Sequence, residues 1–466
     1  MRLPEKFTEQ MKNMLGDDLP NYIEALDRPM YHALRINTLK ISVEDFLKIS
    51  PFKLTPVPWC SNAFYYDAET EFPSKHPYYY AGLYYLQEPS AALPAATLPI
   101  EEGDKVLDIC AAPGGKSTEL LARLGKTGYL VSNDISASRA KALIKNLELF
   151  GAENVLVTCE STDKLAGQFD HYFDKILIDA PCSGEGMFRK STSMVTAWER
   201  NGNEYFANIQ KSILDEAVKM LRPGGMILYS TCTFSGLEDE DSVLYLLKLK
   251  DSLKLVPIEK HEGFVPGRAE WNTGDISEGE GKNLEYTMHL FPHKVQGEGH
   301  FVSLIGDYPE DEASYGSSVS DYYPKSFKIS EELTEFISHI KRDFRRDRFE
   351  NMNGRIYYIP EGCPENGRLH VLRRGLLMGE EKKNRFEPSQ ALAMSLSADE
   401  YDNVLSLPAD DERVIRYLKG ETIEYSDSED LKKGWVLIAV DGFPLGFGKA
   451  ANGQIKNKYL PGWRMT

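Results

Sequence analysis

The sequence predicts an α/β protein whose core is a doubly wound, mostly parallel sheet, and three observations support this. Short apolar runs alternate with helical patterns from about residue 105 to residue 305. A glycine-containing turn follows the first apolar run and opens a helix. Segments of different composition lie on either side of the alternating region. We therefore expect a Rossmann-like core with flanking modules.

The alternating region gives the expected strands and helices in order. The predicted strands are residues 105–110, 128–134, 154–159, 175–182 and 226–232. Apolar residues recur at helical spacing over 136–150 and 204–221, and the second helix is expected to stop at Arg222-Pro223-Gly224-Gly225. Two late runs, TMHLFPH and GHFVSLI, predict antiparallel strands that close the sheet.

The flanking segments predict further modules around a core at 91–305. Residues 1–90 carry LRINTLK and an aromatic, proline-rich stretch, and we expect a small α/β module there. Residues 306–384 are expected to hold a polar, acidic linker, 306–325, and an intermediate module. Alternating runs such as GWVLIAV predict a β-rich module over 385–466.

Composition excludes several classes of protein. The 466 residues are 42% apolar, which suffices for packed cores, and no apolar run approaches the roughly 18 residues that span a bilayer. The first residues lack the pattern of a signal peptide, so we expect a cytoplasmic protein without membrane contact. A net charge of −17 disfavours indiscriminate binding to nucleic acid, so such a partner requires a local basic surface.

Two segments offer basic charge. Residues 431–466 carry six cations against Asp441 alone: Lys432, Lys433, Lys449, Lys456, Lys458 and Arg464. The aromatic residues between them are candidates either for stacking on unpaired bases or for a core: Trp435, Phe443, Phe447, Tyr459 and Trp463. A helical pattern from residue 331 ends in the basic cluster 341–348, which fits either an RNA contact or a solvated helix face.

The six cysteines are widely spaced, at Cys60, Cys110, Cys159, Cys182, Cys232 and Cys363. The paired spacing of zinc ligands is absent, and we expect no metal. A disulfide framework is not expected in so long a chain without an export signal. Any functional cysteine is therefore expected to act as a thiol.

The segment VLDICAAPGGKSTELL predicts a strand, a turn and a helix start beside the carboxyl edge of the sheet, which is typical of a nucleotide-type ligand site. A phosphate-binding P-loop is excluded because Cys110 stands where that motif needs glycine. Asp134 ends the second strand, 26 residues after Asp108, where a carboxylate reaches ribose hydroxyls. The alternative is a solvated carboxylate that caps the helix at Ser136.

Two further motifs, IDAPCSGEGMFRK and YSTCTFSGLEDED, run from strand ends into loops at the same edge. They place Cys182 and Cys232 beside the predicted ligand site. The alternative is that both are buried strand-end thiols, which we expect for the other four cysteines.

The four motifs LDICAAPGGKST, NDIS, ILIDAPCSGEGMFRK and YSTCTFSGLEDED together closely resemble those of RNA 5-methylcytosine methyltransferases, the NOL1/NOP2/Sun family. The resemblance covers about residues 90–305 and implies a class I core that uses S-adenosyl-L-methionine. The long tail resembles the RsmF branch, which acts on 16S ribosomal RNA, and the last segment resembles its PUA-type RNA-binding module.

The resemblance also implies residue roles. Carbon 5 of cytosine is too weak a nucleophile to be methylated unaided, so a thiolate first adds to carbon 6, and a second group assists release. By family pattern Cys232 is the nucleophile, Cys182 assists release, Asp179 bonds the cytosine edge and Lys116 lines the junction of cofactor and substrate. The implied cofactor contacts are Cys110, Ala111, Ala112, Pro113, Gly114, Gly115, Lys116, Asp134 and Asp179.

The resemblance leaves two questions that only the structure can address. The family commonly has an aspartate where this chain has Ser161, and Glu160 and Asp163 are the candidates to replace it. The family pattern also places Arg35 and Lys40 near the substrate.

Three rival functions are carried forward. The first is the same reaction on transfer RNA, because the core motifs do not name the RNA. The second, a noncatalytic RNA-binding ribosome-assembly factor, is disfavoured by the presence of both cysteines with Asp179. The third, a small-molecule methyltransferase, would leave about 250 flanking residues without a purpose.

Overall fold

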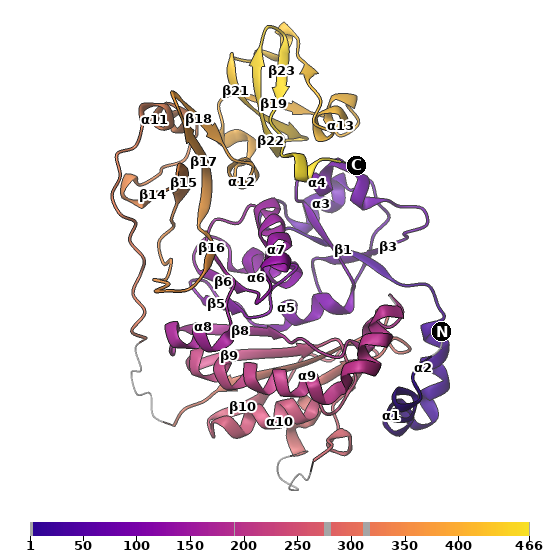
Figure 1. Ribbon diagram of the computed structural model, residues 1–466. Coiled ribbons are helices and arrows are strands. Elements are labelled where there is room, and N and C mark those ends of the chain that lie inside the picture. The colour runs from indigo at the N-terminus through magenta and orange to yellow at the C-terminus, as the bar shows by residue number, and fades with distance from the viewer. Residues whose placement is uncertain (1–2, 191, 275–280, 311–316, 466) are drawn as a thin grey trace.

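The computed structural model describes residues 3–190, 192–274, 281–310 and 317–465, whose strands form four sheets (Figure 1). The largest sheet forms the middle of the molecule. A sheet from the N-terminal residues lies beside it, and the two C-terminal sheets lie against the end that carries α7. No helix in the described ranges has both the length and the apolar content to cross a bilayer.

The central sheet contains all five predicted strands as parallel neighbours in the order β9-β8-β5-β6-β7. They are β5 (Lys105–Asp108), β6 (Tyr129–Asn133), β7 (Val155–Thr158), β8 (Phe173–Asp179) and β9 (Leu221–Thr231). The chain order reverses on either side of β5, so the loops after β5, β6, β8 and β9 meet at one edge. Ligands bind at such a switch point in open α/β sheets.

Antiparallel strands extend the sheet at both edges. The two predicted closing strands are β12 (Met288–Leu290) and β13 (His300–Asp307), and β13 pairs with β9. The short strands β10 (Leu253–Val256) and β11 (Phe264–Pro266) were not predicted. At the other edge β16 (Val371–Arg374) pairs with β7, although the sequence assigned this segment to the intermediate module.

Helices cover both faces of the central sheet (Figure 1). The helices α6 (Gly115–Leu124) and α7 (Ala137–Phe150) bury Leu121 and Leu143 against one face. The other face is covered by α8 (Thr162–Gln168), α9 (Thr192–Met220) and α10 (Glu240–Leu249). The second predicted helix is longer than expected because α9 continues through a kink at Gly202, and it ends just before the predicted stop.

The N-terminal sheet has the order β2-β3-β1-β4. Its strands are β1 (His32–Ile36), β2 (Thr55–Pro56), β3 (Ala63–Tyr66) and β4 (Tyr84–Gln87), and its helices include α1 (Glu5–Leu15), α2 (Leu19–Leu26), α3 (Val43–Ile49) and α4 (Pro77–Tyr80). Phe7 and Tyr22 pack with Trp198 and Phe234 of the core. The short helix α5 (Leu93–Thr97) leads into β5.

The C-terminal residues form two sheets. The first contains β14 (Phe349–Met352), β15 (Arg355–Tyr358), β17 (Leu376–Lys382) and β18 (Arg385–Pro388). The second has the order β19-β21-β22-β23-β20, formed by β19 (Val404–Leu407), β20 (Ile423–Glu424), β21 (Gly434–Val440), β22 (Phe443–Ala451) and β23 (Gln454–Asn457). Three helices accompany them: α11 (Glu331–Ser338), α12 (Gln390–Ser395) and α13 (Glu412–Leu418).

The segment expected to be a linker lies only partly within the described residues. Residues 311–316 lie outside them. On the near side β13 extends to Asp307, and on the far side Ser317 Oγ donates to the Asp170 carbonyl at 3.0 Å. Tyr322 N donates to the Cys363 carbonyl at 2.7 Å. The described ends of this segment therefore bond to folded parts of the protein.

The basic cluster 341–348 is not a helix face, so that interpretation is wrong. Helix α11 ends at Ser338. Arg342 pairs with Glu153 at 2.7 Å and Glu400 at 2.9 Å, and Arg348 is buried and donates to the Ile359 carbonyl at 2.7 Å. These two charges are neutralised or hydrogen-bonded inside the protein.

Candidate active site

The predicted site residues meet at the carboxyl edge of the parallel strands. Residues 110–116 follow β5, Asp134 follows β6, Asp179 ends β8, and Thr231 ends β9 directly before Cys232. The structure thus brings together the loops that the sequence placed at one edge.

The two cysteines of the site face each other. Cys182 Sγ lies 3.3 Å from Cys232 Sγ, and both side chains are partly exposed. The contact with Cys232, together with burial, raises the pKa of the Cys182 thiol well above its usual value. Cys182 therefore carries its proton at neutral pH while the two thiols are in contact.

The loops behind the cysteines are joined by a buried carboxylate. Glu238 accepts hydrogen bonds from Ser183 N at 2.9 Å and from Gln210 Nε2 at 2.9 Å, and burial raises its pKa to about 7. The hydroxyls of Ser183 and Thr233 lie 2.8 Å apart. Ser183 directly follows Cys182, and Thr233 directly follows Cys232. The contacts of these two residues therefore fix the two thiols relative to each other.

A second carboxylate, Glu185, supports the same loops. It accepts from Trp198 Nε1 at 3.0 Å, Asn203 Nδ2 at 2.9 Å and Phe234 N at 2.9 Å. Glu185 and Glu238 lie inside the two cysteine motifs, but sequence reasoning gave them no role. Nothing in the sequence separated Glu185 and Glu238 from the other carboxylates of the two motifs, and nothing marked Asn203.

Asp179 and Lys116 form an ion pair beside the cysteines. Lys116 Nζ lies 2.7 Å from Asp179 Oδ2, and Ser230 Oγ donates to Asp179 Oδ1 at 3.0 Å. Burial acts to raise the pKa of Asp179, but the charge of Lys116 and the contact with His300 outweigh it and lower the pKa. Asp179 is therefore an ionised acceptor. His300, whose Nε2 lies 3.4 Å from Asp179 Oδ1, was not predicted.

The loop at 110–116 is held by Asp134. Asp134 Oδ2 accepts from Ala112 N at 3.2 Å and Oδ1 accepts from Ser136 N at 2.9 Å. The alternative of a solvated capping carboxylate is wrong, because the Asp134 side chain is 2% exposed and Ser136 itself caps α7. Gly114, at φ +111°, is the N-cap residue of α6 and turns the loop toward the helix.

This edge fits a nucleoside-bearing cofactor. A fixed carboxylate at the end of the second strand suits ribose hydroxyls, and the N-terminus of α6 has positive polarity that suits a carboxylate group. Ala111, Ala112 and Gly114 have small side chains or none, which lets a ligand approach the backbone. Lys116 extends from the same loop to Asp179 and so links this region to the cysteines.

Several other predicted positions have partners within the protein. Glu160 already accepts from His370 N and pairs with Lys164, each at 2.8 Å, while Ser161 caps α8 and Asp163 is exposed. Arg35 is buried in an ion pair with Glu119 at 2.9 Å.

Lys40 is partly buried, and its Nζ donates to the carbonyls of Ala81 and Leu149. Burial lowers the pKa of Lys40 to about 7. The side chains of Arg35 and Lys40 therefore bond within the protein, and the placement of this stretch near the substrate stays a prediction.

Comparison with known proteins decides the family. The model of the 16S rRNA methyltransferase RsmB/F matches residues 95–306. The models of the RsmF N-terminal domain, first C-terminal domain and PUA domain match residues 3–89, 335–396 and 404–465. The ribosomal RNA small subunit methyltransferase F of Vibrio parahaemolyticus is 32% identical over 98% of this chain and 96% of its own. The chain belongs to the RsmB/F family of 16S rRNA methyltransferases.

Further RsmB/F relatives and solved structures agree. The methyltransferase F of Escherichia coli O139:H28 is 28% identical over 98% of this chain and 95% of its own. A methyltransferase homologue from Pyrococcus horikoshii superposes with a TM-score of 0.57 at 27% identity, covering 65% of this chain and 95% of that one. NSun6 from the same organism, solved with SFG, has a TM-score of 0.53 at 22% identity, covering 66% and 99%, and shows the shared fold.

The RsmB/F family confirms the predicted architecture: a methyltransferase core, an N-terminal domain and a C-terminal PUA domain. The protein is an rRNA methyltransferase that depends on S-adenosylmethionine. Because the family methylates rRNA, the alternative of a small-molecule methyltransferase is excluded.

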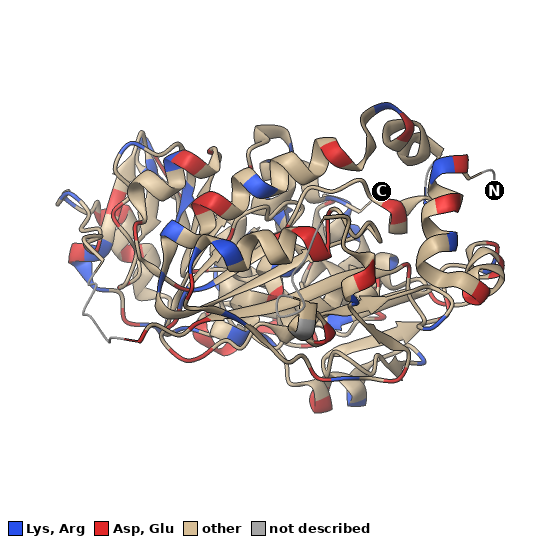
Figure 2. Ribbon diagram, turned by 90° about the horizontal axis from the view of Figure 1, so that it is seen from below, with Lys and Arg blue, Asp and Glu red and all other residues tan. Residues whose placement is uncertain are grey.

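In the RsmB/F PUA domain, three of the five candidate aromatic residues belong to the core. Phe447, Tyr459 and Trp463 are buried. Trp435 is only half-buried, and Lys449 Nζ and Lys458 Nζ lie 5.6 and 5.8 Å from its ring centroid. Lys449 also lines a groove of about 380 Å³ with Trp435. Over the rest of the molecule, acidic and basic residues are interspersed along the chain (Figure 2).

Proposed function

We propose that the protein methylates carbon 5 of cytosine in 16S rRNA through a covalent adduct between Cys232 and carbon 6. The main support is the pair of thiols of Cys182 and Cys232, whose sulfur atoms lie 3.3 Å apart beside the Asp179–Lys116 ion pair. They lie at the same edge of the sheet as the loop 110–116. The family match supports the RNA class, and the thiol pair supports the covalent route.

Attack begins at Cys232. Cys232 attacks carbon 6 as a thiolate. The double bond between carbon 5 and carbon 6 opens, and the resulting enamine lets carbon 5 accept a methyl group. Ionised Asp179 accepts a hydrogen bond from the cytosine amino group, and Lys116 holds that carboxylate in place. S-adenosylmethionine, bound by residues 110–116 with Asp134, supplies the methyl group.

Release requires a base and the loss of the carbon–sulfur bond. The Cys182 thiol is protonated while it contacts Cys232. Once Cys232 is bonded to carbon 6, the contact that raises the pKa of Cys182 most is lost, and burial and Glu238 are the causes that remain. Cys182 then takes the proton from carbon 5, the bond between carbon 6 and Cys232 breaks, and Cys232 leaves as thiolate.

The same proposal specifies which RNA carries the target cytosine. We place the target cytosine in 16S rRNA in or near the small ribosomal subunit, and the enzyme therefore in the cytoplasm. A direct test supplies labelled S-adenosylmethionine with naked 16S rRNA, assembled small subunits or transfer RNA, and identifies the product nucleoside by mass spectrometry. 5-Methylcytidine in 16S rRNA supports the proposal, whereas product in transfer RNA alone supports the rival substrate.

The first prediction concerns cofactor binding. Asp134→Ala is expected to weaken binding of S-adenosylmethionine about 10- to 150-fold, because a hydrogen bond to a charged group contributes roughly 1.5 to 3 kcal/mol. Isothermal titration calorimetry measures the change. Asp170→Ala removes an exposed carboxylate and serves as the control. Equal affinity of the Asp134→Ala variant and the unchanged protein would remove Asp134 from the cofactor site.

The second prediction concerns RNA affinity. Truncation at residue 385 would delete β18 from its sheet, so point variants are the cleaner test. Replacing both Lys449 and Lys458 by Gln is expected to weaken RNA binding and to reduce the salt slope by about 0.7 for each phosphate that a lysine no longer neutralises. The rate at saturating RNA should stay the same.

The matched control for these lysine variants replaces two exposed lysines of the core, Lys254 and Lys260, by Gln. Filter binding between 50 and 200 mM salt, roughly the range over which phosphate contacts are most visible, gives both slopes. An equal slope in the PUA-domain variant and the control would mean that Lys449 and Lys458 do not contact the RNA backbone.

A further inference from the structure

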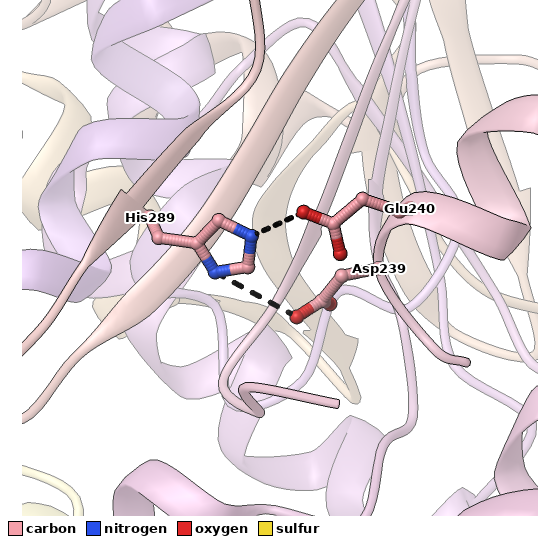
Figure 3. Close-up of side chains that lie close together, drawn as sticks. All are labelled: Asp239, Glu240 and His289. Atoms are coloured by element: carbon pink, nitrogen blue, oxygen red, sulfur yellow. Dashed lines mark hydrogen bonds and ion pairs between the residues drawn. The ribbon is translucent and has the colours of Figure 1, made fainter. Parts of the chain in front are cut away.

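Three ionisable side chains meet behind the nucleophile loop, fully buried and outside the reaction site. Asp239 and Glu240 stand at the start of α10, and His289 lies in the middle of β12 (Figure 3). All three side chains are 0% exposed. One ligand atom of each lies within 4.8 Å of the others. Their positions in the sequence gave no sign of this meeting.

The imidazole lies between the two carboxylates. Its Nε2 is 2.7 Å from Glu240 Oε1, which is a hydrogen bond, and its Nδ1 is 4.0 Å from Asp239 Oδ2 (Figure 3). With Nε2 donating to Glu240, the neutral ring presents Nδ1 as a lone-pair atom toward Asp239. A carboxylate that bonds the outer nitrogen of a histidine in this way is the common arrangement behind metal-ligating histidines.

Three atoms of the cluster lack hydrogen-bond partners among the described residues. They are Asp239 Oδ2, Glu240 Oε2 and His289 Nδ1. All three accept hydrogen bonds while the carboxylates are ionised and the ring is neutral, so a proton or a metal ion must lie between them if they are to be joined. Within the described ranges no lysine or arginine pairs with either carboxylate, and Trp271, Phe291 and Phe301 surround the imidazole. Burial and the neighbouring Glu240 raise the pKa of Asp239 well above its usual value, so the cluster must take up a proton or a cation.

A divalent ion matches the separation of His289 Nδ1 and Asp239 Oδ2 better than a proton on Nδ1. A proton on Nδ1 would draw Asp239 Oδ2 to hydrogen-bond distance, about 3 Å, whereas the two atoms are 4.0 Å apart. A tetrahedral ion with bonds of about 2.0 to 2.1 Å separates its ligand atoms by roughly 3.4 Å, so a shift of about 0.6 Å would close the site. The charge of the ion would neutralise Asp239 and Glu240.

We propose that Asp239 and His289 bind a divalent transition ion of the zinc class at a buried site, with Glu240 holding the imidazole through its Nε2. The residue types suit such ions, because imidazole and carboxylate together favour zinc over calcium or magnesium. The expectation of no metal rested on cysteine spacing, and this site contains no cysteine.

The site would act on the nucleophile through one contact. Thr231 Oγ1 donates to Asp239 Oδ1 at 2.6 Å, and Thr231 directly precedes Cys232. An ion bound by the other oxygen of Asp239 would tie the start of α10 and the strand β12 to the end of β9. It would thereby position the loop that carries Cys232 without touching the substrate.

The test measures the zinc content of the protein and not its methyl transfer. A negative result would therefore contradict the metal site and leave the proposed function untouched. The full chain is purified without an affinity tag from cells grown with added zinc, and its metals are measured by plasma mass spectrometry. About one zinc per chain is expected. Asp239→Asn and His289→Gln should each hold less than a tenth of that amount. His293→Gln, a change at a buried histidine outside the cluster, should hold the full amount.

A second measurement covers variants that fold poorly. The unchanged protein is treated with a chelator, and zinc is returned in about hundredfold excess over its dissociation constant, which should raise the melting temperature by about 3 °C. Magnesium should give no shift. Less than a tenth of an equivalent of zinc, with no thermal shift, would overturn the proposal and leave an ion pair with a protonated histidine. Full zinc content in either cluster variant would also overturn it.

Discussion

Replacing Cys232 by alanine is expected to abolish both methyl transfer and the covalent protein–RNA adduct. Without the thiol no bond to carbon 6 can form, so carbon 5 stays unreactive. The loss should persist with RNA that contains 5-fluorocytosine, a base whose adduct cannot be released because its carbon 5 carries no proton. Denaturing gels with labelled RNA show the adduct, and incorporation of labelled methyl groups shows the transfer.

Cys182→Ala is expected to give the opposite result, a covalent protein–RNA band on the denaturing gel. Cys232 still attacks and one methyl group is transferred, but the proton on carbon 5 has no base 3.3 Å from the nucleophile. The enzyme should therefore remain bound to ordinary RNA as a covalent band and stop after one turnover. Cys159→Ala, a change at a partly exposed cysteine outside the pair, should behave like the unchanged enzyme.

Two outcomes would contradict these roles. A trapped adduct in Cys232→Ala with none in Cys182→Ala would exchange the two assignments, as in DNA cytosine-5 methyltransferases, which attack with their Pro-Cys residue. Adducts in both variants would mean that neither thiol is the unique nucleophile, and the covalent route proposed for this pair would be wrong.

Asp179→Asn is expected to lower kcat/KM about 10²- to 10³-fold, because it removes the charged acceptor for the cytosine edge and leaves Lys116 unpaired. The pKa of Asp179 is lowered by Lys116 and His300 despite burial, so the carboxylate is ionised at every pH at which the protein is assayed. The factor should therefore be the same from pH 6 to pH 9. Steady-state kinetics across that range measure it.

The control for Asp179 is Asp251→Asn, a change at an exposed carboxylate of the same core, which should keep kcat/KM within twofold. Lys116→Met should cause a loss similar to that of Asp179→Asn, and the double variant should be little worse than either single one, because the two side chains act as one unit. Additive losses would show that Lys116 and Asp179 act independently.

The parallel core could be predicted because its strands are buried on both faces and read as continuous apolar runs. The strand β16 could not, since its sequence VLRR ends in two arginines. Arg373 is nevertheless buried, with a carboxylate partner in Glu148, far away in the sequence. A partner that lies so far along the chain leaves no local pattern.

The site shows the same division. Cys182, Cys232, Asp179 and Lys116 stand in motifs whose strand ends share one edge, so topology alone brings them together. The groups that hold them come from other elements: His300 belongs to β13, and Asn203 lies in α9. Their roles depend on packing that the sequence does not display.

The partners of basic residues were hidden for the same reason. The sequence offered the basic cluster 341–348 as either an RNA contact or a solvated helix face, and the family pattern placed Arg35 near the substrate. Arg342 instead pairs with Glu153, and Arg35 pairs with Glu119 of α6. In both cases the partner belongs to the methyltransferase core, so these cations bind the flanking modules to it.

Bisulfite sequencing of total RNA tests the central claim most directly. RNA is compared from cells with the gene, without it, and with only the Cys232→Ala form. We predict at least one cytosine of 16S rRNA that resists conversion with the intact gene and is converted in the other two. Unchanged 16S rRNA, together with new conversion in transfer RNA or none at all, would contradict the claim that this protein is a 16S rRNA cytosine-5 methyltransferase acting through Cys232.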